Sequence, residues 1–193
     1  MNCHESQFLA EKTLVEIEPK FTDGDVYHMI CGDVGPFEAG VKTSVPLWMA
    51  VCLKEKHRCR IQPPAWLCVD TLEDWLRKER ESTLVGAVAE GFKEIAALLL
   101  TKAADDVPDS GRLKVLVQDL WDVRSAKLRT SVSEFVRSRR KFARVTDFTQ
   151  LEIAAARPLL VENNSASSAA PAFEQSLASS SAAGVSLSTF SVQ

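Results

Sequence analysis

A long amphipathic segment in the second half of the chain limits the folds open to this sequence most strongly. Winding residues 111–144 at about 100° per residue gathers large apolar side chains on one side of a helix. They are Leu113, Val117, Leu120, Trp121, Leu128 and Phe135. Leu116 and Val123 widen this apolar stripe to nearly half of the circumference, more than a helix that covers one surface needs. We therefore expect a long helix over residues 109–144 that packs on more than one side, within its own bundle or across a subunit interface.

Two cations lie within this stripe, at positions where a purely structural pattern would have leucine. Arg124 falls near the middle of the stripe and Lys127 falls at its edge. Removing a guanidinium from water is costly unless carboxylates and carbonyl groups pair with it, so the pattern predicts a partner acid for Arg124. That acid belongs either to a neighbouring helix of this chain, such as Asp70 or Asp74, or to another protein. The periodicity does not separate these alternatives.

A basic cluster follows the apolar stripe. Its members are Arg137, Arg139, Arg140, Lys141 and Arg144. Cations are favourable near a helix C-terminus because of the macrodipole, so part of the cluster has a structural explanation. A solvated helix face is the favoured interpretation. The alternatives are contact with an acidic protein partner and contact with the phosphate backbone of a nucleic acid, which positions a protein without reading sequence.

The N-terminal third of the chain carries strand patterns. Residues 12–18 alternate apolar and polar side chains, which is the period-2 pattern of a half-buried strand, and Pro19 ends the run. A β-branched and aromatic run over residues 26–31 predicts a second strand, which we expect to form a hairpin with the first. The glycines and the proline of residues 32–40 predict a loop after it.

A short helix over residues 46–57 and a strand over residues 59–62 are expected next. The pair Pro63 and Pro64 follows and disfavours helix at the residue before each proline. We place a domain boundary at this pair, so that residues 1–62 form a small β-rich domain.

Beyond the boundary the periodicity is helical almost throughout. Besides the long helix, we expect helices over residues 70–80, 92–103 and 147–156. Asp70 is the predicted N-cap of the first of these, and together they form a helical domain over residues 63–161. Residues 162–193 are rich in Asn, Ser and Ala, with too few large apolar side chains to offset the ordering entropy, and are predicted to be a disordered tail. The predicted fold class is α+β, mainly α.

Composition favours an intracellular protein without a membrane segment. The net charge is -3, so the chain lacks the basic excess of a dedicated nucleic-acid-binding domain. No apolar run approaches the roughly 20 residues that span a bilayer, and the N-terminus has no secretory signal pattern. The five cysteines are scattered without a CxxC pair, which favours buried free thiols in a reducing compartment, the cytosol or the nucleus.

The sequence offers no recognised catalytic, cofactor or metal motif. The three histidines, His4, His28 and His57, lie in or before the small domain and in no known arrangement. Residues 32–35 lack the spacing of a phosphate-binding loop, and the closely spaced ligand pairs of a zinc site are absent. We expect a protein that is not an enzyme, with no catalytic residue, no cofactor and no bound metal.

Five short motifs follow one another along residues 8–153. They are FLAEK at 8–12, GDVGPF at 32–37, VPLW at 45–48, CRIQPPAW at 59–66 and LVQDLWDVRSAKLR at 116–129. As an ordered set they resemble the second-subunit family of the GINS complex, the Psf-type partners of the Sld five subunit. The motif of the long helix is the strongest of the five.

This resemblance implies a small β-rich domain before a helical one, in a nuclear, non-catalytic subunit of a heterotetramer with three sister subunits. It also implies that the tetramer joins the MCM motor and cell-division-cycle protein 45 as the helicase of replicating DNA, with the ATPase in the MCM ring. We expect the stripe residues, with Arg124 and Lys127, to form the subunit interface. The alternative is a stand-alone adaptor that binds nucleic acid or an acidic protein through the basic cluster.

Overall fold

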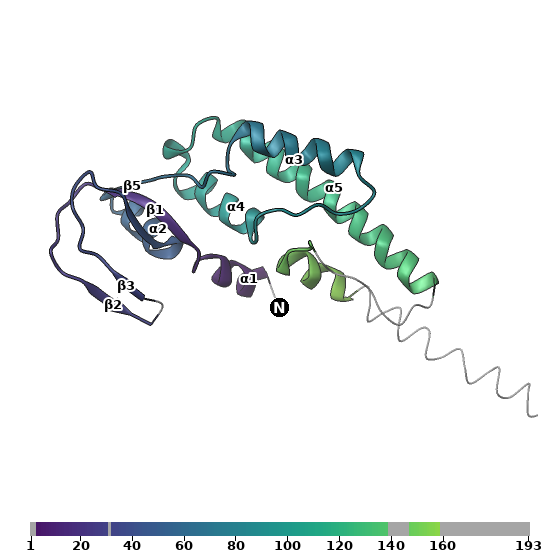
Figure 1. Cartoon of the computed structure of the whole chain (residues 1–193), viewed down its shortest axis with the longest axis horizontal. Coiled ribbons are helices and arrows are strands. Elements are labelled where there is room, and N and C mark those ends of the chain that lie inside the picture. Colours follow the sequence, from purple (N-terminus) through teal and green to yellow (C-terminus); the bar gives the residue numbers. More distant parts are fainter. Residues whose placement is uncertain (1–2, 31, 139–146, 159–193) are drawn as a thin grey trace, which may run out of the picture.

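The computed structural model describes residues 3–30, 32–138 and 147–158. It has the α+β architecture that the sequence predicts, mostly helical, with a small sheet near the N-terminus followed by a group of helices (Figure 1). The predicted fold class is therefore confirmed.

Three antiparallel strands form the main sheet, in the order β4-β1-β5. β1 (Leu14–Pro19) lies in the centre, between β4 (Thr43–Pro46) and β5 (Cys59–Ile61). Val15 and Ile17 of β1 are buried while the residues between and beside them are more exposed, because successive side chains of a strand point to opposite faces. The strands predicted at the start of the chain and before the proline pair are confirmed.

One helix packs on this sheet and another precedes it in the chain. α2 (Leu47–Glu55) follows β4 directly, since Pro46 is both the last residue of the strand and the N-cap residue of the helix. α1 (Cys3–Ala10) precedes β1 and was not predicted. The buried hydroxyl of Ser6 in α1 donates a hydrogen bond to the carboxylate of Glu94, which ties α1 to the helical part of the chain.

A two-stranded ribbon projects from the sheet part of the molecule (Figure 1). It pairs β2 (Tyr27–Met29) with β3 (Gly32–Val34) in antiparallel register. Two predictions are therefore wrong: the first two strands do not form a hairpin with each other, and residues 32–34 are a strand rather than part of a loop. The physical reason is that β4 and β5 occupy both edges of β1, so β2 pairs with the chain that follows it.

Helices make up most of the remaining described chain. They are α3 (Val69–Glu81), α4 (Phe92–Lys102), the 3-10 turn η1 (Ala104–Asp106), α5 (Ser110–Arg137) and a short helix at 150–158. The helices that the periodicity predicts are present, but the predicted cap is wrong. Cys68 is the N-cap residue of α3, and Asp70 lies inside the first turn, where a carboxylate still faces the positive end of the helix dipole.

The long helix α5 spans 28 residues. It begins after Asp109, whose φ of 52° is left-handed, and ends at Arg137, with a turn at Ser138. The prediction extended this helix to residue 144, and residues 139–144 lie outside the described residues, as does the tail that was predicted to be disordered.

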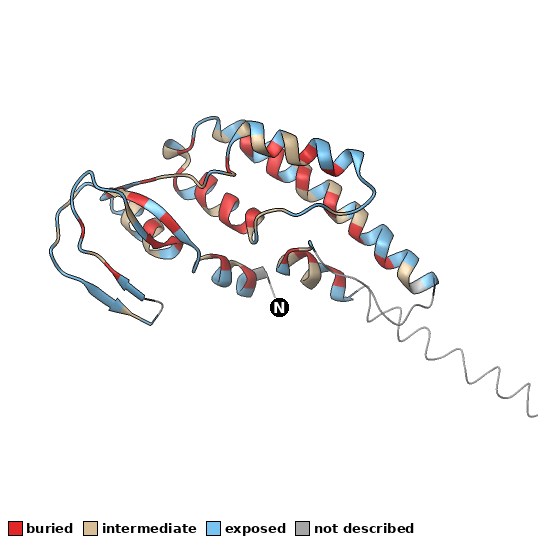
Figure 2. Cartoon of the chain, viewed as in Figure 1, coloured by how far each residue is buried: buried red, intermediate tan, exposed pale blue. Residues whose placement is uncertain are grey.

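One apolar core runs through both parts of the chain, from Ile17 in the sheet to Leu113 in α5 (Figure 2). A polar contact reinforces this junction. The Asp106 carboxylate accepts a hydrogen bond from the backbone N–H of Ile61 at 2.8 Å and pairs with Lys54 at 2.7 Å. The sheet and the helices are therefore joined by shared apolar burial and by a paired, nearly buried carboxylate.

Candidate functional site on the long helix

The structure divides the predicted interface residues of α5 by exposure. Five are buried inside this chain: Leu113, Val117, Leu120, Arg124 and Leu128. They pack against other elements of this chain, and their part in a subunit interface stays a prediction. Trp121, Lys127 and Phe135 are half-buried, and for these three the interface stays a prediction.

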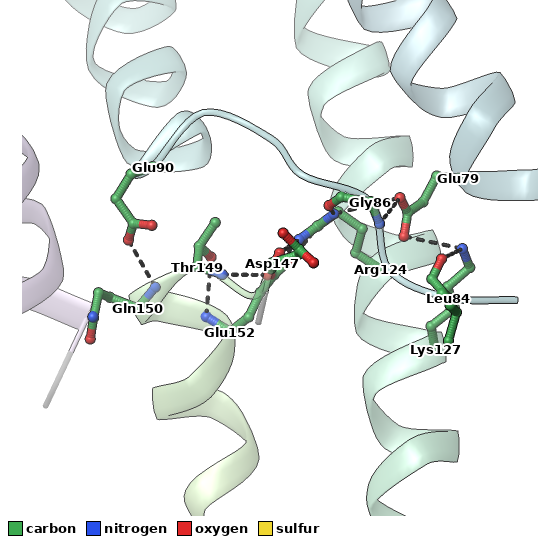
Figure 3. Close-up of polar contacts among 10 residues, drawn as sticks. All are labelled: Glu79, Leu84, Gly86, Glu90, Arg124, Lys127, Asp147, Thr149, Gln150 and Glu152. Atoms are coloured by element: carbon green, nitrogen blue, oxygen red, sulfur yellow. Dashed lines mark hydrogen bonds and ion pairs between the residues drawn. The ribbon is translucent and has the colours of Figure 1, made fainter. Parts of the chain in front are cut away.

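Arg124 is fully buried and every nitrogen of its guanidinium has an acceptor (Figure 3). Nε and Nη2 donate to the two carboxylate oxygens of Glu152, at 2.6 and 2.9 Å. Nη1 donates to the backbone carbonyl of Gly86 at 2.7 Å, and Nη2 also donates to that of Asp147 at 2.8 Å. The burial of this arginine and its need for an acid are as the sequence predicts, and the acid belongs to the same chain.

A second acid completes the charge balance of this site. Glu79 lies 3.5 Å from Nη1 of Arg124 and accepts from Lys127 Nζ at 3.1 Å, while its other oxygen accepts from the backbone N–H of Gly86. Lys127 also donates to the carbonyl of Leu84 at 3.0 Å. Two cations therefore face two carboxylates, and we call Arg124, Lys127, Glu79 and Glu152 the arginine cluster. Because all four carboxylate oxygens accept hydrogen bonds, the cluster binds chain segments to one another.

The predicted partners Asp70 and Asp74 do not contact Arg124. Asp74 pairs instead with Arg77 and Lys78 on its own helix. The reason is the direction of the helices. α3 and α5 run parallel, as the ion pairs Glu73–Arg112 and Arg80–Asp119 show. Asp70 and Asp74 therefore lie level with the start of α5, and Glu79 at the end of α3 reaches Arg124.

The partner Glu152 could have been found from a local sequence signal. Thr149 and Glu152 have the spacing of a capping box, in which the first and fourth residues bond to each other's backbone N–H groups. In the structure the N–H of Thr149 donates to Glu152 at 2.8 Å, and the N–H of Glu152 donates to Thr149 Oγ1 at 3.4 Å. The capping glutamate thus holds the start of the 150–158 helix and the buried arginine together.

An apolar groove lies where Trp121 of α5 meets α4. It encloses about 440 Å³ between α1, α4, α5 and the 150–158 helix. Its lining includes Gln7, Ala97, Leu98, Thr101, Trp121 and Leu151. The ammonium group of Lys93 lies 3.5 Å from the centroid of the Trp121 ring, a cation–π contact at the rim. This groove was not predicted, because its walls come from segments far apart in the sequence.

The basic cluster is described only at its first member. Arg137 is exposed in the last turn of α5. Arg139, Arg140, Lys141 and Arg144 lie outside the described residues. The three interpretations of the cluster therefore stay open.

Comparison with known proteins assigns both parts of the chain. Residues 2–62 match the PSF2 N-terminal domain, and residues 66–168 match the GINS complex protein helical bundle domain. The chain belongs to the PSF2 family of GINS proteins. It is 42% identical over 154 residues to the DNA replication complex GINS protein PSF2 of Homo sapiens, covering 79% of this chain and 83% of that protein.

More distant PSF2 proteins are similar over the same extent. The probable GINS protein PSF2 of Caenorhabditis elegans is 39% identical over 161 residues, covering 83% of this chain and 89% of that protein. The PSF2 protein of Candida albicans is 30% identical over 159 residues, covering 81% and 76%. The arginine cluster and most of the groove lie within the helical-bundle match of the PSF2 family.

The thiols of this PSF2 family member differ in exposure. Cys59 is buried, and burial raises the pKa of its thiol to about 11, so it stays protonated at neutral pH. Cys52 and Cys68 are exposed, so buried free thiols were a wrong expectation for these two.

Within the described ranges, no three His, Cys, Asp or Glu side chains are grouped to hold a metal ion. In the same part of the chain, no helix combines the length and the apolar composition needed to cross a membrane.

Proposed function

We propose that this chain is a non-catalytic scaffold subunit of a nuclear GINS heterotetramer, formed with three sister subunits. The tetramer joins the MCM helicase ring and cell-division-cycle protein 45 as the helicase that unwinds DNA in the initiation and elongation of replication. The observation that carries this proposal is the similarity of both parts of the chain to PSF2 proteins, which are named as members of a DNA replication complex. In this role residues 1–62 and 63–161 act as two structural units and residues 162–193 as an appended tail.

The apolar groove supports a subunit contact. Permanent interfaces commonly bury on the order of 2,000 Å² or more, much of it apolar. The groove leaves part of Trp121 and Leu98 open, and α1, which contributes Gln7 to it, also exposes Phe8 by 60% and Leu9 by 48%. Apolar surface of this kind on neighbouring elements fits a sister subunit better than it fits solvent.

Co-expression tests this proposal. The chain is produced with and without the three sister subunits and analysed by size-exclusion chromatography with light scattering. We expect self-association of the chain alone and one monodisperse heteromer in the co-expression. A stable, monodisperse monomer of the chain alone contradicts an obligate subunit.

A matched pair of variants locates the contact. Ala97 is exposed in the groove, and Ala126 is exposed on α5 away from it. Ala97→Glu should lower the yield of the heteromer, whereas Ala126→Glu should leave it unchanged, because only the first places a charge in the apolar contact. Equal yields for the two variants contradict the use of the groove.

The second candidate function is a stand-alone adaptor that binds nucleic acid or an acidic protein through the basic cluster. The exposure of Arg129 and Arg137 near the end of α5 favours it. An adaptor covers its own apolar surface, so it purifies as a monomer. The co-expression experiment therefore separates the two functions.

A further inference from the structure

Residues 147–158 cover one part of α5 with a small apolar contact of their own. Leu128 and Val132 of α5 are buried against Ala156 and the half-buried Phe148, in a cluster separate from the main core. The main core reaches along α5 only as far as Leu120 among its buried members. We call residues 147–158 the strap. Figure 1 shows it as the short green helix beside the lower part of the bundle.

Polar contacts hold the strap more than apolar burial does. Both carboxylate oxygens of Glu152 and the carbonyl of Asp147 accept from Arg124. The N–H of Gln150 donates to the exposed Glu90 carboxylate at 2.9 Å (Figure 3). Among the described residues of the strap, Ala156 is the only apolar residue that is buried. The buried polar attachment of the strap is thus made by a single arginine.

Arg124 keeps two of its polar contacts when the strap detaches from α5. Its Nη1 still donates to the Gly86 carbonyl and lies near Glu79, both of which belong to the body of the chain. The Glu152 carboxylate returns to water. The main penalty for breaking a buried ion pair is an uncompensated buried charge, and lifting the strap produces none, because the site opens to solvent as the acid departs.

We propose that the strap opens as a unit while the rest of the bundle stays folded, and that its opening uncovers one face of α5. Opening exposes Leu128 and Val132 and removes Leu151, which is a wall of the apolar groove. Elements with few buried apolar contacts open with lower free energy than the global core. This inference rests on contacts within the chain and does not depend on the proposed assembly.

Hydrogen exchange measured by mass spectrometry on the full-length chain, in the form in which it purifies, tests the strap. Amides of residues 151–157 should exchange at least about 10-fold faster than those of residues 113–121, because local opening needs less free energy than unfolding of the core. Glu152→Gln weakens the charged hydrogen bonds and should speed exchange in the strap by about 10- to 100-fold, with residues 113–121 changed less than about twofold.

Two further variants keep the test decisive. Thr149→Ala removes the cap without touching Arg124 and should speed exchange of the strap by a smaller factor. Glu134→Gln makes the same chemical change as Glu152→Gln at an exposed position of α5 and should change nothing. The proposal is overturned if Glu152→Gln speeds residues 113–121 as much as the strap, since the strap then opens only by global unfolding. It is also overturned if neither Glu152→Gln nor Thr149→Ala alters exchange in the strap.

Discussion

The two halves of α5 carry one continuous apolar stripe but are covered in different ways. The first half, from Ser110 to about Val123, packs against α3 and α4 and belongs to the core shared with the sheet. The second half, ending at Arg137, contacts the strap through the separate cluster around Leu128. An apolar stripe in a sequence therefore identifies the face of a helix that is buried. It does not indicate how stably the covering segment is attached.

Arg124 lies at the junction of the two halves and belongs to both. It binds the end of the α3 region through Glu79 and Gly86, and the strap through Glu152 and Asp147. A leucine here would pack against either side without linking them. The arginine instead ties three segments of the chain by directed bonds, which makes the junction the position most sensitive to substitution.

The largest effect is expected for Arg124→Ala. Removing one partner of a buried ion pair costs about 3–5 kcal/mol where the remaining charge stays buried. Glu152 can return to water with the strap, but Glu79 is 3% exposed, belongs to the body of the chain and loses the nearby guanidinium. The measurement is the free energy of unfolding of the purified protein in urea. The control is Arg129→Ala on the same helix, where an exposed arginine contributes about 0–1 kcal/mol. Parent-like unfolding of Arg124→Ala means that the guanidinium is not buried in solution.

Leu120→Ala tests the first half of α5. This side chain has no exposed surface, and its neighbours in α3 and α4 are held by the shared core. Truncating a buried leucine costs about 2–5 kcal/mol, and the upper part of that range applies where the site cannot collapse. Urea unfolding measures this loss. A cost below about 1 kcal/mol contradicts the placement of Leu120 in the core.

Leu128→Ala makes the same truncation in the second half. Leu128 is 9% exposed and faces a strap that can move to fill the space, so we expect a cost of about 2 kcal/mol or less. The comparison rests on the difference between the losses of unfolding free energy in Leu120→Ala and Leu128→Ala. Equal losses for the two leucines mean that the strap is as rigid as the core.

The helix phase of this region was predictable from the sequence, but the identity of the partner acids was not. Periodicity fixes which side of α5 Arg124 faces, and that side proved to be buried. It does not report which segment lies opposite. α3 runs parallel to α5, so the residue that meets Arg124 is Glu79 at its end rather than Asp70 or Asp74 nearer its start.

Strand pairing failed for a related reason. Alternation over residues 12–18 predicts a half-buried strand, which the structure has at 14–19, yet the alternation does not select the neighbouring strands. β1 pairs with β4 and β5 from later in the chain, and the expected hairpin with the second strand does not form. The groove could not be predicted for the same reason, because its walls come from four separate segments of the chain. Local patterns determine faces, and tertiary contacts determine partners.

The smallest effect on stability is expected at the end of the second half, where the basic cluster begins. Arg137→Ala, Arg139→Ala and Arg140→Ala combined should leave the fold and the heteromer intact, because cations at a helix end contribute only about 0.3–1 kcal/mol each. The informative measurement is DNA binding by the purified protein as a function of salt. Each phosphate contact that is lost lowers the slope of log K against log salt by about 0.9 for duplex DNA. A shallower slope in the triple variant therefore supports contact with phosphate. In that case the end of α5 binds nucleic acid, whereas the first half of the helix packs in the core. An unchanged slope with an intact heteromer supports a solvated face, and loss of a protein partner at unchanged slope supports an acidic protein contact.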